Sequence, residues 1–152
     1  MMSNSNIYHE MIIDYSRNPI NFGTLVKPDI FMHDSNPLCG DSIDLYMNVN
    51  NEQSISEVKF NGKGCAICIA CTSVLTEMTK GKKIDDVIKI NKTDVLSELG
   101  LQKLNPVRIK CALLSLKILK FSIYSYLSDK MKTEDTKSEK LVKLKEDASH
   151  LY

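Results

Sequence analysis

Three short segments constrain this chain most, because each places a cysteine where a turn or loop meets regular structure. They read NPLCGD at 36–41, GKGCAIC at 62–68 and RIKCALL at 108–114. In an extended segment residues i and i+2 point the same way, so one metal could take the side chains of both Cys39 and Asp41. Three thiolates and one carboxylate complete the coordination of a soft metal such as zinc, or hold part of an iron–sulfur cluster. We therefore expect Cys39, Asp41, Cys65 and Cys111 to converge.

The remaining cysteines are open to simpler interpretations. Free cysteines are often small buried hydrophobic residues, and we expect this for Cys68 and Cys71, one and two turns into an apolar helix. A ferredoxin loop at Cys65-x-x-Cys68-x-x-Cys71 would need a loop conformation and a Cys-Pro pair that the chain lacks. A thioredoxin-like Cys65–Cys68 pair would follow a βαβ pattern, and none precedes it. His33 could reach the site, but a loop histidine is more often solvated.

Charge around the cysteines favours a thiolate site. Cys65 opens a helix, where the dipole stabilises an anion, and Cys111 is expected near the start of another helix. Four anionic ligands on a divalent ion leave a net negative charge, which Arg108 and Lys110 are placed to offset.

Composition narrows the class of protein. The chain has 152 residues, 43% of them apolar, and a net charge of +1, so we expect one globular domain without a polyanionic partner such as nucleic acid. No apolar run approaches the ~20 residues that a membrane-spanning helix needs, and the polar start has no signal-peptide core. Five cysteines, three of them within 65–71, fit a disulfide framework poorly. A cytoplasmic protein is expected.

Apolar periodicity predicts the order of the elements. Helices are expected at 7–17, 66–80, 84–88, 93–99 and 109–127, and strands at 43–49 and about 54–61, with a further short strand near 30–34. Gly62-Lys63-Gly64 is expected to break the last strand. The fold class is α+β, with helices packed on one face of a small antiparallel sheet of about three strands. Residues 1–127 form the predicted domain, and 128–152 a charged tail that is flexible or partly helical.

The motifs resemble a known family, the IscU/SufU/NifU-N-terminal proteins of iron–sulfur cluster assembly. The resemblance runs from Ile7 to about Leu127 and includes YHEMIIDYSRNPINFG at 8–23 besides the three cysteine segments. It implies the family's α+β fold with the site at one exposed end. It also implies that the site consists of Cys39, Asp41, Cys65 and Cys111.

The resemblance implies a carrier rather than an enzyme with free substrate turnover, and two subtypes stay open. In the scaffold branch the site builds a transient [2Fe–2S] cluster, and in the SufU branch it holds zinc while a cysteine accepts persulfide sulfur. Lys110 stands where scaffolds usually have histidine, which resembles SufU. The 45 residues between Cys65 and Cys111 resemble the shorter scaffold type. Cys39 and Cys111 are the candidate persulfide acceptors, supported by the charges of Lys110 and Arg108.

The implied partners are a PLP-dependent cysteine desulfurase and apo-acceptor proteins. Residues 104–108, LNPVR, resemble a chaperone-recognition stretch, but Asn105 replaces a proline, so a chaperone partner is doubtful. Two other classes remain as alternatives. One is a structural zinc module that binds another protein, and the other is an electron-transfer iron–sulfur protein.

Overall fold

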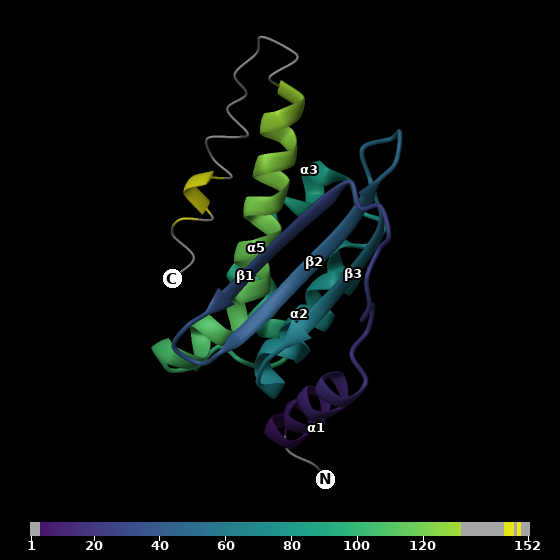
Figure 1. Ribbon diagram of the computed structural model, residues 1–152. Helices are drawn as coiled ribbons and strands as arrows, with labels where there is room; N and C mark the ends of the chain where they lie inside the picture. Colours follow the sequence, from purple (N-terminus) through teal and green to yellow (C-terminus); the bar gives the residue numbers. More distant parts are fainter. Residues whose placement is uncertain (1–3, 132–144, 148, 150–152) are drawn as a thin grey trace.

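The computed structural model describes residues 4–131, 145–147 and 149, and the account below is restricted to them. Three strands are followed and preceded by helices, in the order predicted from the sequence (Figure 1). The elements are α1 (Asn4–Arg17), β1 (Ile30–Asn36), β2 (Asp41–Val49), β3 (Ile55–Lys63), α2 (Ala66–Thr79), α3 (Ile84–Val87), α4 (Lys92–Glu98) and α5 (Pro106–Met131). The predicted α+β class is confirmed.

The strands form one antiparallel sheet in the order β1–β2–β3. At one end of the first hairpin Asn36 pairs with Asp41, so that residues 37–40 form a tight turn with Cys39 in it. Side chains alternate across a strand, and the buried residues of β2 are every second one, beginning with Asp41 and continuing through Ile43 and Leu45. The carboxylate of Asp41 therefore belongs to the inner face of the sheet, at its end.

Helices α2 and α5 cover that inner face, and the other face of the sheet is free of helices in Figure 1. Ten of the fourteen residues of α2 are buried, because this helix is apolar nearly all round and lies between the sheet, α1 and α5. The core joins the inner face of the sheet to both helices, through fully buried side chains such as Ile43, Leu45, Phe60, Leu75 and Leu116. Cys68 and Cys71 belong to this core, as predicted.

Gly62 does not end strand β3, contrary to the prediction that Gly62-Lys63-Gly64 breaks this strand. Strand β3 runs on to Lys63 because Gly62 fits within the ladder at φ 146°, a conformation that other residues rarely adopt. A Cβ there would lie 2.1 Å from the carbonyl oxygen of Ser42 on the neighbouring strand. The chain leaves the sheet only at Gly64, directly before Cys65.

The long helix begins three residues earlier and ends later than predicted. Asn105 precedes it, and its side-chain oxygen accepts the backbone N–H of Arg108 at 2.9 Å, so Pro106 takes the first helical position. Cys111 consequently lies in the second turn of α5 rather than at its start. The helix continues past Leu127 to Met131. The tail beyond it lies mostly outside the described residues, so its predicted character stays a prediction.

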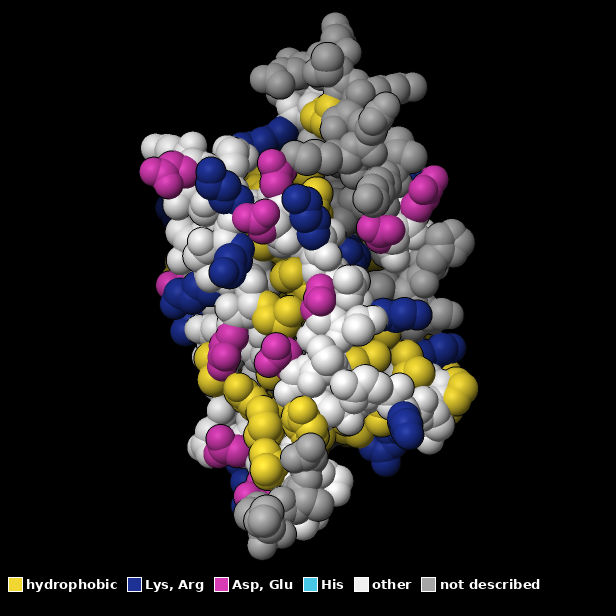
Figure 2. All heavy atoms as spheres, turned by 180° about the vertical axis from the view of Figure 1, so that it is seen from behind, with side chains coloured by type: hydrophobic (Ala, Val, Ile, Leu, Met, Phe, Trp, Pro, Cys, Tyr) yellow, Lys and Arg dark blue, Asp and Glu magenta, His cyan; other side chains and the backbone are white. Residues whose placement is uncertain are grey.

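Seen from behind, the helical side carries basic and acidic side chains interspersed around hydrophobic ones (Figure 2). No large surface of a single charge is visible in this view, which agrees with the net charge of +1. Among the described residues, no helix combines the length and the apolar character needed to cross a bilayer.

Candidate metal centre

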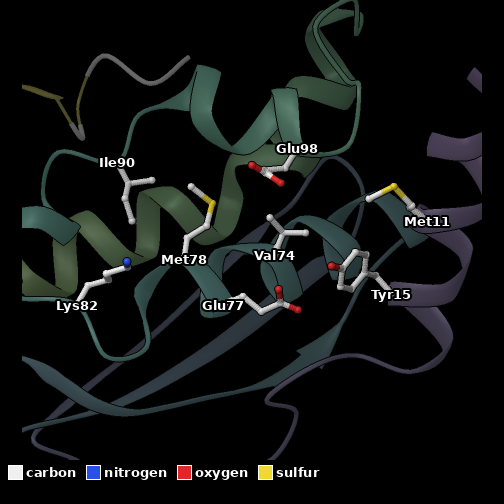
Figure 3. Close-up of a pocket in the computed structure, with 8 residues that line it drawn as sticks. All are labelled: Met11, Tyr15, Val74, Glu77, Met78, Lys82, Ile90 and Glu98. Atoms are coloured by element: carbon white, nitrogen blue, oxygen red, sulfur yellow. The ribbon is translucent and has the colours of Figure 1, made fainter. Parts of the chain in front are cut away.

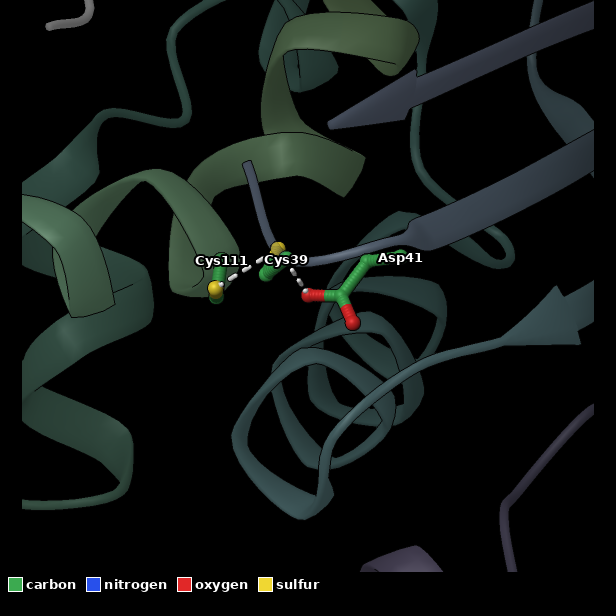
Figure 4. A group of neighbouring side chains, drawn as sticks. All are labelled: Cys39, Asp41 and Cys111. Atoms are coloured by element: carbon green, nitrogen blue, oxygen red, sulfur yellow. Dashed lines mark hydrogen bonds between the residues drawn. The ribbon is translucent and has the colours of Figure 1, made fainter. Parts of the chain in front are cut away.

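Three of the four predicted site residues meet at one end of the sheet (Figure 4). Cys39 comes from the β1–β2 turn, Asp41 from the first position of β2, and Cys111 from α5. Their ligand atoms all lie within 4.8 Å of one another. Cys39 is exposed, whereas Asp41 and Cys111 are buried, so the group is open to solvent on the side of the turn.

Short contacts connect the three side chains. The Cys39 thiol donates to Asp41 Oδ2 at 3.0 Å, and the Cys111 thiol donates to Cys39 Sγ at 3.1 Å (Figure 4). Thiolates bind soft and borderline metals such as zinc and iron, and a carboxylate oxygen is a harder ligand. The donor set therefore fits a zinc ion or an iron–sulfur cluster, with ligand positions already collected by the fold.

Cys65 lies beside this group and is joined to it through Asp41. Its backbone N–H donates to Asp41 Oδ1 at 3.0 Å, and its Sγ lies 3.9 Å from Asp41 Oδ2. It also caps α2, because its Sγ accepts the backbone N–H of Cys68 at 3.4 Å. The sequence correctly placed Cys65 at a helix start, where backbone N–H groups favour a thiolate. Cys65 is not a member of the compact group, which consists of Cys39, Asp41 and Cys111.

The turn that carries Cys39 is built by Asn36. The carbonyl oxygen of Asn36 accepts the N–H groups of Cys39 and Gly40, at 3.3 and 2.9 Å, and its side-chain Oδ1 accepts the N–H of Leu38 at 3.1 Å. Gly40 adopts φ 73°, which closes the turn. Sequence reasoning did not single out Asn36, although an Asn-Pro pair ahead of a glycine is a recognised turn signal.

Gly64 was also missed as a site residue. A Cβ at this position would lie 3.0 Å from Sγ of Cys68 and 3.2 Å from Oδ1 of Asp41. The glycine thus allows the chain to pass close to the carboxylate that joins the two sides of the site. Its signal in the sequence was its place directly before the second cysteine.

Burial keeps the inner thiols protonated in the metal-free protein. Burial is the main cause of the raised pKa of Cys111, and its hydrogen bonds with Cys39 and Asp41 raise this pKa further. Burial likewise raises the pKa of Cys68, and it raises that of Cys71 to about 12. A metal must displace the proton of Cys111 on binding. Cys68 and Cys71, held in the core, are expected to stay inert thiols.

The predicted supporting cations lie on the first two turns of α5. Arg108 is exposed, and Lys110 is partly buried and lines a small cavity between the β1–β2 turn and α5. His33 does not reach the thiols, because it lies on β1 and its Nδ1 pairs with Asp44 on β2.

A larger cavity of ≈ 420 Å³ is lined by residues of α1, α2 and α4 and by Lys82 and Ile90, which lie just before and after α3 (Figure 3). Met11, Val74 and Met78 give it an apolar lining, and Tyr15 and Glu77 face each other at one end. Burial raises the pKa of Tyr15, and Glu77 raises it further. No cysteine is among the described residues that line this cavity.

Comparison with known proteins assigns the family. The model of the NifU-like N terminal domain matches residues 7–133. The chain belongs to this family. The iron sulfur cluster assembly protein 1 of Debaryomyces hansenii, a mitochondrial protein, is 37% identical over 134 residues, which cover 86% of this chain and 73% of the relative. The scaffold protein IscU of Escherichia coli is 36% identical over 124 residues, or 80% of this chain and 94% of the relative.

Solved structures show the same fold. A cluster assembly scaffold assigned to the SUF system of Fervidobacterium islandicum superposes on this chain with a TM-score of 0.68 at 28% identity. The superposition covers 80% of this chain and 99% of the Fervidobacterium chain. A NifU-like N-terminal protein from Brucella abortus, at 19% identity and a TM-score of 0.63, shares the fold. The proteins similar to this chain thus include an IscU scaffold and a SUF-system scaffold.

Proposed function

We propose that this protein is a scaffold for iron–sulfur cluster assembly and that Cys39, Asp41, Cys65 and Cys111 hold its metal or cluster. One observation carries the proposal: two thiols and a carboxylate from three separate segments lie within 4.8 Å at an open end of the fold. The named relatives are cluster assembly proteins, and this chain aligns with most of their length, which supports the same role here. The protein acts as a carrier, without turnover of a free substrate.

The mixed donor set suits a cargo that must leave again. Asp41 is a harder and weaker iron ligand than thiolate, so a cluster bound partly through it is labile. Cys39 is exposed and gives an apo-acceptor access to one edge of the cargo. A transient [2Fe–2S] cluster is therefore the proposed cargo. An electron-transfer protein would instead require a cluster that is retained.

Zinc binding with sulfur transfer is the second function, and Lys110 favours it. The proposed sulfur donor is a PLP-dependent cysteine desulfurase. The thiolate of Cys39 or Cys111 would attack the outer sulfur of the partner's persulfide, forming a new S–S bond while the partner leaves as a thiolate. No external oxidant is needed. Lys110 and Arg108 are proposed to attract the anionic persulfide, and we propose the cytoplasm as the place of action.

Metal analysis of protein purified without oxygen separates these functions. A scaffold should bind iron and sulfide on reconstitution, show visible absorbance, and pass the cluster to an apo-acceptor. A sulfur acceptor should contain zinc, increase alanine release by a cognate desulfurase, and gain one sulfur by mass on Cys39 or Cys111.

The variant Lys110→Glu should impair sulfur loading more than metal content, with Lys92→Glu on α4 as the matched control. A stable, reversibly reducible cluster would contradict both functions in favour of electron transfer. If the metal is needed only for folding, and neither a cluster nor a sulfur adduct forms, the result would favour a structural zinc module.

A further inference from the structure

The cavity of ≈ 420 Å³ among α1, α2 and α4 has no role in the metal centre described above. Met11, Val74, Met78 and Ile90 give it apolar walls. Methionine side chains adapt their shape to a ligand, and they are common on surfaces that bind other proteins. The volume lies near the lower end of the roughly 300 to 1,000 Å³ of ligand sites, so the cavity suits one long side chain of a partner.

One end of this apolar cavity is negatively charged. The carboxylates of Glu77 and Glu98 flank Val74 there, and Glu77 faces the hydroxyl of Tyr15 (Figure 3). Both carboxylates act on the Tyr15 phenol and raise its pKa, which places both near this end. Lys82 lines the opposite end, beyond Met78 (Figure 3). Two carboxylates and one lysine leave the lining with a negative excess, concentrated beside Tyr15.

Glu98 is placed where its own helix disfavours it. It is the last residue of α4, and the negative end of a helix dipole destabilises an anion. The last turn of α4 contains no basic residue. Within the described part of the chain, the Glu98 side chain makes no hydrogen bond or ion pair. A cation bound from outside would remove this unfavourable electrostatic interaction, so the cavity favours a positively charged occupant.

We propose that this cavity is a docking site for an arginine side chain of a partner protein. The apolar stem of an arginine packs on walls such as Met78, while its planar guanidinium forks toward the carboxylates of Glu77 and Glu98. Lysine offers a point charge without this fork. At ~1.5 Å per residue along α2, Glu77 lies about 18 Å from Cys65. A partner can therefore dock here while the metal centre stays accessible, and this docking does not depend on the proposed function.

The test is an NMR titration of the full-length ¹⁵N-labelled protein at constant ionic strength. The blocked peptide acetyl-Gly-Arg-Gly-amide is compared with its lysine and citrulline versions and with free arginine. We expect saturable shifts of the Glu77 and Glu98 backbone amides with the arginine peptide, severalfold weaker binding with lysine, and no saturation with citrulline, which keeps the shape but lacks the charge.

Four outcomes would overturn the proposal. One is that the arginine peptide does not saturate these shifts, and another is that the lysine or citrulline peptide binds as tightly. Tighter binding of free arginine than of the peptide would assign the cavity to a small molecule. Shifts that change with the protein concentration alone would assign it to a second copy of this chain.

Variants identify the cavity as the binding site. Glu98→Gln and Glu77→Gln keep the shape of each side chain but remove its charge, and each should weaken binding of the arginine peptide about tenfold, the weight of one hydrogen bond between charged groups. Glu52→Gln, in the exposed β2–β3 turn, is the matched control and should leave binding unchanged. If one cavity variant fails to fold, the other decides alone, and unchanged binding would overturn the proposal. Metal content is measured separately and should stay at the parent's value in all three variants, so a failure of the proposed function would be seen independently.

Discussion

Asp41 Oδ1 accepts the backbone N–H of Cys65 at 3.0 Å, while Oδ2 of the same carboxylate accepts the thiol of Cys39 at 3.0 Å. Asp41 is thus the residue through which the β1–β2 turn and the start of α2 meet. We propose that Asp41 both binds the metal and positions Cys65, and variants at this residue should separate the two roles.

Replacing Asp41 should change cluster release more than cluster formation. Asp41→Ala removes the harder ligand, and a reconstituted cluster should then pass to an apo-acceptor several times more slowly than in the parent. The measurement is the decay of visible absorbance with an acceptor present. Asp41→Asn is the matched variant, because it retains an oxygen for the N–H of Cys65. Faster loss of absorbance in Asp41→Ala would contradict the role of Asp41 in lability.

The cysteines should divide into ligands and core residues. Cys39→Ser and Cys111→Ser are expected to lower bound zinc or iron sharply, because each removes a thiolate. Cys71→Ala should leave the metal content unchanged and cost about 1 kcal/mol of stability, from the small cavity left in the core. Metal is counted by elemental analysis, and folding is checked by circular dichroism. A folded Cys68→Ala or Cys71→Ala protein without metal would show that the ligand assignment is wrong.

Gly64 should be intolerant of even one added carbon. Gly64→Ala places a Cβ 3.0 Å from Sγ of Cys68 and 3.2 Å from Oδ1 of Asp41, so the carboxylate must shift and metal affinity should fall about tenfold or more, as for other changes in groups that orient metal ligands. Lys63→Ala, at the exposed neighbour, is the control. Adding Cys68→Ala to Gly64→Ala removes one of the clashing atoms and should restore part of the affinity in a zinc competition titration. Wild-type affinity in Gly64→Ala would rule out this tight approach.

Alkaline pH should destabilise the fold partly through Cys71. Burial disfavours the thiolate and raises the pKa of Cys71 to about 12 in the folded protein, from an ordinary value of 9.0. The unfolded chain therefore releases this proton first, and the stability that the neutral thiol contributes is lost as pH rises from about 9 toward 12, at up to about 1.4 kcal/mol per pH unit. Urea unfolding of the metal-free protein should show a smaller alkaline loss for Cys71→Ala than for the parent. Identical pH profiles would contradict this.

The C-terminal tail should be dispensable for the site. Truncation after Met131, the end of α5, is preferable to the predicted boundary at Leu127, which would cut the helix. Metal content and the desulfurase response should stay near the parent's values, because the site lies near the opposite end of α5. The contact of Lys145 with the ring of Tyr124 predicts at most a small loss of stability, seen as a slight fall in Tm. A large loss of metal on truncation would show that the tail supports the site.

The sequence by itself determined the element types and the identity of the candidate ligands. Alternation along Ile43, Leu45 and Met47 predicted a strand with one buried face, and the periodic apolar residues from position 109 onward predicted the long helix. The two short helices before the Pro106 loop were also found, because local patterns set them. These features depend on neighbours a few residues away, so periodicity reveals them.

The tertiary structure decided what depends on contacts between distant segments. Gly62 was predicted to end a strand, but its fit against Ser42 of the neighbouring strand lets β3 continue to Lys63. Asn105 caps α5 three residues before the predicted start, so Cys111 lies in the second turn of the helix. There its Sγ lies 3.1 Å from Sγ of Cys39. The cavity at Asn36 and the place of Gly64 against Asp41 exist only because a turn, a strand end and two helices meet at one end of the sheet. No local pattern encodes those distances, since they arise from how the packed elements align.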